Sequence, residues 1–206
     1  MTNFQHTLNK VDDVFKRMDQ SYRQTAAELG FVCAGCEENC CRTLFHHHTL
    51  IEYLYLREGL STLPTELHRL AVQRAAEVLE RTDTAQDRAV KRMCPLNIDG
   101  RCIVYAHRPM ICRLHGIPHS LRRPDGLRQV GPGCADFDRQ YAGTDPIRLD
   151  RTPLYAALAE LERELRQNLR FTRKLKMTIA QMITETICIA PAAPSSGKND
   201  EIHQHP

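Results

Sequence analysis

Apolar side chains near the start of the chain recur at alternating intervals of three and four residues. Positions with this spacing share one face of a helix, so the pattern predicts an amphipathic helix over residues 7–29. Gly30 follows directly and favours a C-terminal stop there. The predicted apolar face consists of Leu8, Val11, Phe15, Met18, Tyr22, Ala26 and Leu29.

Two later segments carry the same pattern. Pro64 opens one of them, which continues with weaker amphipathicity toward Met93 and is expected to break near Thr82. Over residues 153–188, apolar side chains recur at helical spacing among Glu and Arg, which predicts one long helix with a bend near Thr172. Packing of this helix onto helix 7–29 is the ordinary way to bury both apolar faces.

The region between these helices has a different character. Residues 94–134 scatter Pro and Gly among short apolar runs, which is typical of a compact loop-rich unit with short strands. Within it, residues 117–121 and 127–131 are predicted to be two strands of a hairpin, because the Pro-Asp-Gly sequence between them suits a tight reversal. The stretch RTLFHHHTL, residues 42–50, is expected to form another short strand.

Composition indicates a folded protein without strong charge. Hydrophobic residues make up 42% and charged residues 26% of the chain, and the net charge of +3 gives no strong attraction to nucleic acid or membrane surfaces. The first residues lack the features of an export signal, and the apolar segment 177–192 is too short and too polar to span a bilayer. We therefore expect a soluble, cytoplasmic protein with no membrane partner.

Nine cysteines add a candidate chemistry to this picture. Reducing conditions keep thiols free and the count is odd, so metal ligation explains them better than disulfides do. Residues 33–41 contain a CxxC knuckle, which aims two thiolates at one point, followed by an adjacent pair. The predicted metal ligands are Cys33, Cys36, Cys40, Cys41, Cys94, Cys102, Cys112 and Cys134.

Eight thiolates equal two complete Cys₄ sets, which leaves open two zinc ions, iron, two iron–sulfur clusters, or one cluster with additional thiols. Each tetrathiolate zinc site carries two net negative charges that nearby cations should offset. Residues 91–134 contain eight Lys and Arg side chains against only Asp99 and Asp125. Nucleic-acid binding by the same cations is less favoured, because few aromatic side chains interleave with them.

These motifs resemble the YkgJ-type cysteine-cluster family, which is described as zinc- or iron-chelating. The resemblance covers about residues 33–136 and implies metal binding by the eight matching cysteines. Flagellin lysine N-methylases are said to carry a similar signature. The family's first element is often spaced by three residues and then two, whereas here the order is two and then three, so the order of ligation within it stays open. The matching elements are the CxxCxxxCC of residues 33–41, Cys94-Pro95, the GRC of residues 100–102, the YxxRPxxCR core of residues 105–113 and Gly133-Cys134.

The sequence as a whole predicts an α+β, mainly helical fold. Helices 7–29 and 153–188 flank a small, loop-rich, cysteine-ligated metal centre at about residues 31–136, which includes a short β-hairpin. The length suits one ordinary domain, so residues 1–190 are assigned to a single cysteine-cluster domain. Residues 191–206 are rich in Pro, Ser and charge without apolar anchors, which predicts a disordered tail.

A few other residues are weaker candidates for metal binding. His46 and His48 would share one face of a strand while His47 takes the other, so all three cannot easily meet one ion. His115, close to the Cys-Arg pair at residues 112–113, is a minor candidate ligand. Cys188 lies far from the other cysteines and is expected to be a packed or free thiol.

The leading hypothesis is a protein that binds zinc or iron, including an iron–sulfur cluster, through the eight cysteines. One alternative is an iron–sulfur-dependent protein-modifying enzyme related to flagellin lysine N-methylases. Others are a nucleic-acid or protein-partner adaptor with a structural metal, and metal storage or delivery through the adjacent pair Cys40 and Cys41. The sequence contains no phosphate loop, nucleophile elbow or HExxH zinc helix, so no catalytic residue is assigned and the question of enzyme activity stays open.

Overall fold

The structure is a computed structural model that describes residues 4–33, 40–81 and 92–189. Three sequence-based expectations lie outside these residues: the position of Cys36, the break near Thr82 and the disorder of residues 191–206. The described part is mainly helical with two small sheets, so the predicted α+β class is confirmed. None of its helices combines the length and apolar character that crossing a membrane requires.

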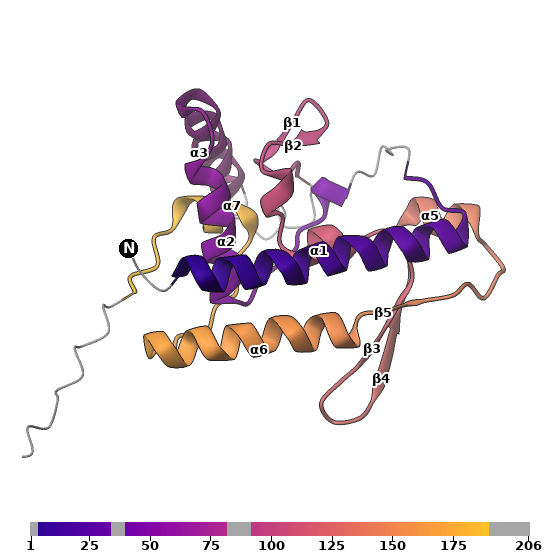
Figure 1. Cartoon of the computed structure of the whole chain (residues 1–206). Helices are drawn as coiled ribbons and strands as arrows, with labels where there is room; N and C mark the ends of the chain where they lie inside the picture. Colours follow the sequence, from indigo (N-terminus) through magenta and orange to yellow (C-terminus); the bar gives the residue numbers. More distant parts are fainter. Residues whose placement is uncertain (1–3, 34–39, 82–91, 190–206) are drawn as a thin grey trace, which may run out of the picture.

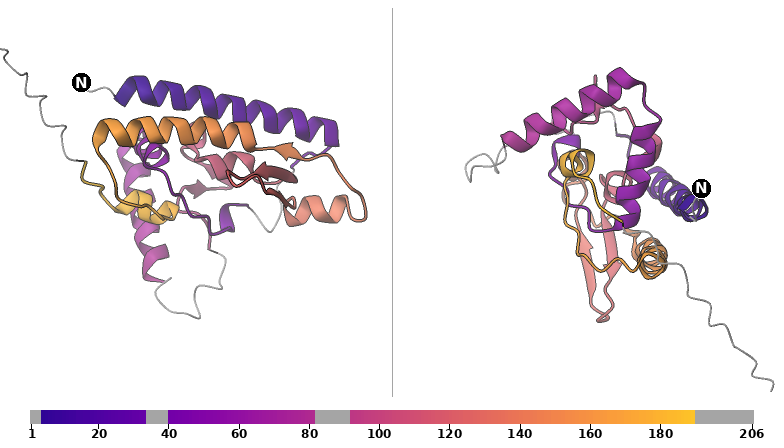
Figure 2. Two further views of the ribbon diagram at one scale, coloured as in Figure 1. Left: turned by 90° about the horizontal axis from the view of Figure 1, so that it is seen from below. Right: turned by 90° about the vertical axis from the view of Figure 1, so that its left-hand side faces the viewer.

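Two long helices lie side by side and run in opposite directions (Figures 1 and 2). Helix α1 spans Phe4–Leu29 and α6 spans Thr152–Leu169. The stripe on α1 faces inward, with Val11, Phe15 and Met18 fully buried. The predicted first helix and its packing against the later helix are confirmed.

The predicted helix over residues 153–188 is wrong as a single element. Helix α6 ends at Leu169 because Arg170 adopts the left-handed conformation, with φ of 51°, and its N–H bonds to the carbonyls of the last turn. An extended segment follows, and a separate helix, α7, spans Ile179–Thr184. Thr178 begins α7 through a capping box with Gln181, a local signal that the prediction from apolar spacing did not take into account.

Two further helices, α2 and α3, follow each other along the chain. Helix α2 spans Leu50–Ser61 and is buried on most sides, which explains its weak amphipathic pattern. Helix α3 spans Thr65–Glu80, begins after Pro64 as predicted, and packs against α7. Figure 1 shows α3 rising away from the α1 and α6 pair.

The strand expected over residues 42–50 is wrong. Within the described residues this segment pairs with another only at one isolated bridge, between His47 and Met177. The N–H of each residue donates to the carbonyl of the other, at 2.7 and 2.9 Å. Residues 40–42 form a 3₁₀ turn, η1 (Cys40–Arg42), and α2 begins at Leu50, so both ends of the predicted strand belong to other elements.

Two small sheets complete the described fold. The hairpin predicted over residues 117–131 is confirmed as antiparallel β3 (His119–Arg122) and β4 (Arg128–Gly131), with β5 (Leu149–Asp150) pairing in parallel with β3. A second hairpin joins β1 (Asn97–Ile98) to β2 (Arg101–Cys102). The remaining elements are the 3₁₀ turn η3 (Tyr105–His107), α4 (Met110–Leu114) and α5 (Ala135–Gln140).

Candidate metal centre

Seven of the eight predicted ligands line one cavity of about 590 Å³. The eighth, Cys36, lies outside the described residues. The cavity also has an apolar wall that includes Phe31, Leu56 and Val104. Four separate stretches of chain therefore contribute thiols to a single space. The lining thiols belong to Cys33, Cys40, Cys41, Cys94, Cys102, Cys112 and Cys134.

The β1–β2 hairpin positions Cys94 and Cys102. Cys94 immediately precedes the hairpin and accepts the N–H of Asn97 on its carbonyl at 2.9 Å, while Cys102 pairs with Asn97 across the strands. Asp99 and Gly100 form the tight turn, with φ of 50° and 80°. Two consecutive residues with positive φ fit a two-residue hairpin loop, and Asp-Gly is a sequence that adopts it.

Backbone N–H groups point at the sulfurs of this hairpin. The N–H groups of Leu96 and Asn97 donate to the Cys94 sulfur, and the N–H of Val104 donates to the Cys102 sulfur. Burial raises the pKa of both thiols, to about 12 for Cys94, and these hydrogen bonds act in the opposite direction. Donors of this kind stabilise a thiolate, which is the form that binds metal.

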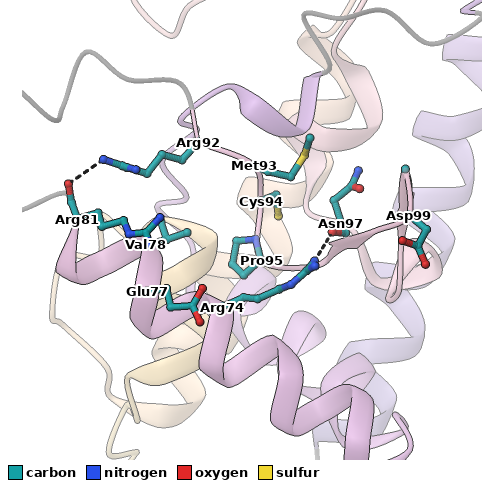
Figure 3. A pocket seen from close by; sticks show the side chains of 11 residues that line it. Arg74, Glu77, Val78, Arg81, Arg92, Met93, Cys94, Pro95, Asn97 and Asp99 are labelled. Atoms are coloured by element: carbon teal, nitrogen blue, oxygen red, sulfur yellow. Dashed lines mark hydrogen bonds between the residues drawn. The ribbon is translucent and has the colours of Figure 1, made fainter.

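Contacts with helix α3 hold the same loop from the other side. Arg74 donates to the Asn97 carbonyl at 2.7 Å, and Arg92 donates to the Arg81 carbonyl at 3.1 Å (Figure 3). These side chains line a second cavity of about 500 Å³, between α3 and residues 92–100, and Cys94 contributes to both cavities.

The turn η1 brings Cys40 and Cys41 to the cavity. The N–H of Cys94 donates to the Cys41 carbonyl at 2.7 Å, which ties this turn to the β1–β2 hairpin. A hydrogen bond between the two neighbouring thiols raises the pKa of Cys40 and lowers the pKa of Cys41. The Asn97 amide and the nearby Arg108 charge also lower the pKa of Cys41. Cys41 is therefore the more acidic thiol of the pair.

Helix α4 carries Cys112 and is anchored by a buried carboxylate. The Glu52 side chain, 3% exposed, accepts the N–H of Met110 at 2.9 Å and the Thr49 hydroxyl at 2.6 Å. It thereby supplies a partner for a first-turn N–H of α4, which lacks one within the helix. Burial raises the pKa of Cys112, and the neighbouring thiols Cys94 and Cys102 raise it further.

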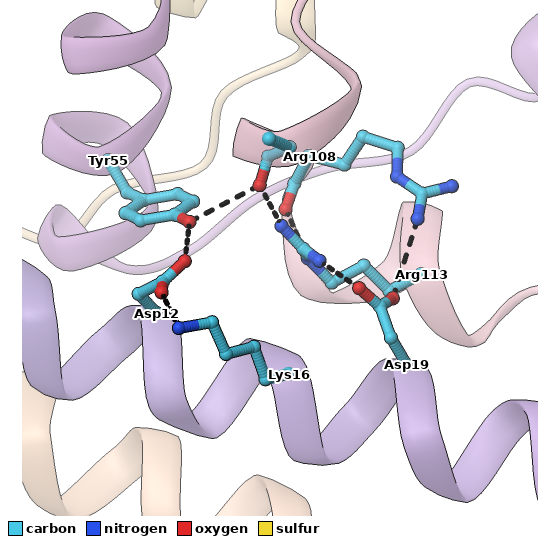
Figure 4. Close-up of polar contacts among 7 residues, drawn as sticks. Asp12, Lys16, Asp19, Tyr55, Arg108 and Arg113 are labelled. Carbon is cyan, nitrogen blue, oxygen red and sulfur yellow. Dashed lines mark hydrogen bonds and ion pairs between the residues drawn. The ribbon is translucent and has the colours of Figure 1, made fainter.

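An arginine clamp fixes the chain just before and after Cys112. Arg113, whose side chain is 3% exposed, donates to Asp19 on α1 at 2.5 Å and to the carbonyls of Ala106 and Arg108 (Figure 4). Burial lowers the pKa of Arg113, and the Asp19 charge opposes that shift. The clamp thus attaches the loop and α4 to the longest helix.

Arg108 lies beside the thiols. It pairs with Asp19 at 3.4 Å, and its guanidinium lies 3.5 Å from the Tyr105 ring centroid. Its positive charge lowers the pKa of Cys41 and acts against the burial-driven rise in the pKa of Cys102. Arg108 is thus one member of the predicted basic excess that acts on the cysteines.

Cys134 and Cys33 line the cavity together with Tyr22. The Cys134 N–H donates to the Gly116 carbonyl at 2.9 Å, and its sulfur accepts the N–H of Phe137 at 3.5 Å. Burial raises the pKa of Tyr22 to about 12, and the nearby charges of Cys33, Cys134 and Cys40 contribute to the rise. The Phe31 and Phe137 rings, 5.1 Å apart, hold the segments of Cys33 and Cys134 together.

The described thiols are not close enough together to coordinate one ion as they stand. Within the described ranges no three or more His, Cys, Asp or Glu side chains form a group that could hold an ion. Thiolates brought to ligand distance repel each other unless a cation lies between them. The donor set, with N–H groups on its sulfurs and an arginine beside it, fits a thiophilic metal that would draw the thiols together.

The weaker candidates occupy different places. His115 lines the cavity, where its ring packs against Phe45. His48 makes a hydrogen bond with the Leu175 carbonyl at 3.1 Å, and His46 is exposed. Cys188 is exposed in the segment after α7, and the structure records no disulfide among the described cysteines.

Several residues that build the site were missed by sequence reasoning. The β1–β2 hairpin could have been found from Asp99-Gly100, which is a strong local turn signal. Asn97, Asp19 and Glu52 had no such signal, because each acts on segments far away in the sequence. Their roles depend on the tertiary fold.

Comparison with known proteins agrees with the chemistry of the cavity. The family model CxxCxxCC, described as "Putative zinc- or iron-chelating domain", matches residues 32–131. In this chain three residues, not two, separate Cys36 from the pair that begins at Cys40. Neither the curated proteins nor the solved structures searched yield a match.

Proposed function

We propose that the chain binds zinc or iron through the eight cysteines predicted as ligands, seven of which lie within residues 32–131, the stretch that matches the family model described as a zinc- or iron-chelating domain. The observation that carries the proposal is the convergence of thiols from η1, the β1–β2 hairpin, α4 and the start of α5 on one cavity. Ordinary core packing does not collect so many thiols from distant segments, whereas soft metals select thiolate ligands.

The surroundings of the thiols support this function. A thiol must lose its proton to bind metal, and N–H donors to the sulfurs of Cys94, Cys102 and Cys134 favour that step. The charge of Arg108 favours it as well. A bound ion would supply a crosslink between segments of a loop-rich region that has little core of its own.

Metal analysis of the protein purified without oxygen tests the proposal directly. We expect zinc or iron to remain bound after gel filtration, measured by mass spectrometry of the elements. A colourless zinc protein would indicate tetrathiolate sites, whereas visible absorption with acid-labile sulfide would indicate an iron–sulfur centre. Protein that contains neither metal, and takes up neither when reduced and reloaded, would contradict the proposal.

A matched pair of cysteine variants links the metal to the cavity. Cys112→Ser removes a cavity thiol and is expected to lower the bound metal, because a hydroxyl is a poor ligand for a soft metal. Cys188→Ser makes the same chemical change at an exposed cysteine outside the match and should leave the metal content unchanged. Equal metal content in the two variants would exclude Cys112 as a ligand.

A further inference from the structure

We infer that the free edge of strand β4 is a docking site for an extended, acidic segment of a partner protein. The described strands of this sheet are ordered β4, β3, β5, so β4 has a neighbouring strand on one side only. Figure 1 and the right-hand view of Figure 2 show the β3–β4 hairpin projecting beyond α6. No residue of the two strands lines the thiol cavity, so the inference goes beyond the proposed function and does not depend on a bound metal.

The hydrogen bonds of the hairpin determine which backbone groups face outward. The Arg123 N–H donates to the Leu127 carbonyl at 2.8 Å, and the direction of these groups alternates along each strand. Arg128 and Val130 therefore turn their N–H and carbonyl groups away from β3. Ser120, which lies opposite Val130, uses its carbonyl to bond toward β5 at 2.9 Å, in agreement with this alternation. The edge thus presents two donors and two acceptors, the pattern that an added strand uses.

Two arginines give this edge a positive face. Arg128 lies opposite Arg122 on β3, and residues in such a pair share one face of the sheet, so two exposed guanidinium groups are neighbours. Within the described part of the chain neither arginine forms an ion pair. Asp150 lies within electrostatic reach of both, but its carboxylate already accepts the Thr152 N–H at 2.9 Å. Since like charges in this arrangement repel, an added carboxylate would stabilise the pair.

An exposed apolar side chain lies next to the charged pair. Val130 is 58% exposed and shares the face of Arg128, two residues further along β4. At the turn, Arg123 and Asp125 form an ion pair at 3.1 Å and neutralise each other. An added strand would place one side chain opposite Arg128 and another, two residues away, opposite Val130. The recognised sequence therefore has an acidic and an apolar residue separated by one position.

Two other occupants fit this edge less well. A second copy, paired antiparallel through both Arg128 and Val130, would place the two Arg128 side chains diagonal to each other on one face, where like charges repel. A nucleic acid would use the guanidinium groups but leave the outward N–H and carbonyl groups without strand partners, and two arginines supply few phosphate contacts. An acidic peptide strand satisfies the backbone groups and the charges together.

Fluorescence anisotropy with a labelled peptide tests the inference on the full-length protein. In the test peptide Glu and Val are separated by one Thr, and a control peptide of the same composition has Glu and Val in adjacent positions. We expect the test peptide to bind at least about fivefold more tightly, because only its acidic and apolar side chains share one face of a strand. Equal binding of the two peptides, or no binding of either, would overturn the inference.

Charge reversal tests the role of Arg128. In Arg128→Glu a carboxylate opposes the peptide's Glu, so we expect binding to weaken by about 5- to 20-fold. A peptide with Lys in place of Glu should show the opposite preference and bind Arg128→Glu more tightly than the unaltered protein. Arg69→Glu, the same change at an exposed position of α3, is the matched control and should alter neither affinity. If the preference does not reverse, Arg128 does not face the peptide and the inference fails.

A proline tests the role of the backbone. Val130→Pro removes an N–H that faces away from β3, and proline is tolerated on edge strands, so the hairpin can still form. We expect peptide binding to weaken by about 5- to 10-fold through the lost hydrogen bond. Val130→Thr keeps the N–H and the branched shape and should bind nearly as the unaltered protein does. Circular dichroism confirms that each variant is folded. Unchanged binding in folded Val130→Pro would rule out strand addition.

Two further measurements distinguish the peptide from the other occupants. In sedimentation of the protein without peptide, we expect the unaltered protein and Val130→Pro to have the same oligomeric state. In titration with labelled single-stranded DNA, we expect weaker binding than with the test peptide. A dimer that dissociates in Val130→Pro would assign the edge to a second copy. DNA binding that is tighter than peptide binding and insensitive to Val130→Pro would assign the arginines to nucleic acid. Either result would overturn the inference.

Discussion

Arg113 shows how one side chain can decide the placement of a whole motif. Its guanidinium is buried, lies 4.5 Å from the Phe15 ring centroid and donates to Asp19 and to two loop carbonyls (Figure 4). A buried cation is tolerable only where its partners are in place. The Cys-Arg pair of residues 112–113 therefore joins a predicted ligand to a structural anchor in consecutive positions.

Loss of the Asp19 carboxylate should destabilise the protein strongly. In Asp19→Ala the Arg113 charge stays buried without its counter-ion, which typically costs about 3–5 kcal/mol. Urea denaturation measures the free energy of unfolding. Asp13→Ala is the matched control on the same helix, because Asp13 is exposed and lies 3.9 Å from Lys16, a pair worth about 1 kcal/mol or less. Similar losses in both variants would contradict the clamp.

His47 should make stability depend on pH. Burial lowers the pKa of His47 to about 4, below its usual 6.5, and its buried Nε2 atom has no hydrogen-bond partner within the described structure. The unfolded state therefore binds this proton more readily, so stability is full above about pH 6.5 and falls as the pH decreases toward about 4. Between about pH 7.5 and pH 5 the loss from this group amounts to roughly 2 kcal/mol.

Substitution separates His47 from other titrating groups. His47→Leu cannot take up the proton, so the stability difference between the two pH values should shrink relative to the unaltered protein. His6→Leu, at an exposed position of α1, should keep the original difference. Denaturation curves at both pH values provide the measurement, and an unchanged difference in His47→Leu would contradict the assignment.

At the level of elements, the first turn of α2 is capped by its own Thr49 and also by a carboxylate from another helix. Glu162 of α6 is 8% exposed, and its two oxygens accept the N–H groups of Leu50 and Ile51 at 2.8 and 2.9 Å. Arg166 pairs with the same carboxylate. A negative group at a helix N-terminus also interacts favourably with the helix dipole. The start of α2 is therefore coupled to α6.

Removing this cap should weaken the fold. Glu162→Ala leaves two N–H groups of α2 and the Arg166 charge without their partner, and we expect a loss of about 2–4 kcal/mol in the free energy of unfolding. Glu160→Ala, two residues before Glu162 and on the exposed side of α6, removes only a surface pair with Arg163 and should cost less than about 1 kcal/mol. Equal, small losses for both variants would show that the cap contributes little.

The elements also show where sequence patterns succeed and fail. The spacing of apolar residues predicted α1 and the Pro-Asp-Gly turn predicted the β3–β4 hairpin, because both depend on contacts between near neighbours. The same spacing extended one helix across residues 170–178, where the chain instead leaves the helix so that Met177 can pair with His47. The left-handed Arg170 and the capping box at Thr178 end one helix and begin the next, and the apolar spacing alone does not register either signal.

At the scale of the whole molecule, we expect bound metal to stabilise residues 92–136 more than the helices α1 and α6. The helices α1 and α6 bury their own apolar faces against each other, whereas residues 92–136 contain short strands and single turns. If metal supplies the crosslink in this region, its removal should raise hydrogen exchange mainly there and leave α1 and α6 protected. Exchange measured with and without a zinc or iron chelator tests this. Identical exchange in both samples would contradict a structural role for the metal.

The sequence alone determined the chemical class of the site and much of the helical frame. Cysteine spacing and count indicate thiolate ligation, and apolar periodicity defines the face of α1, because both properties are written in residues close together along the chain. It also predicted that the cysteine segments would come together, and the structure places seven of those thiols on one cavity.

Only the tertiary structure decided how those segments are held and which thiols are neighbours. Several polar side chains bind groups on distant segments, and no local sequence pattern predicts such a partner. They are Asn97, Glu52, Asp19 and Glu162. A buried polar group can stay in the core only if its hydrogen bonds are satisfied, and those partners exist only after the chain has folded. The sequence therefore specifies which side chains can act as ligands, and the tertiary packing specifies where those side chains lie.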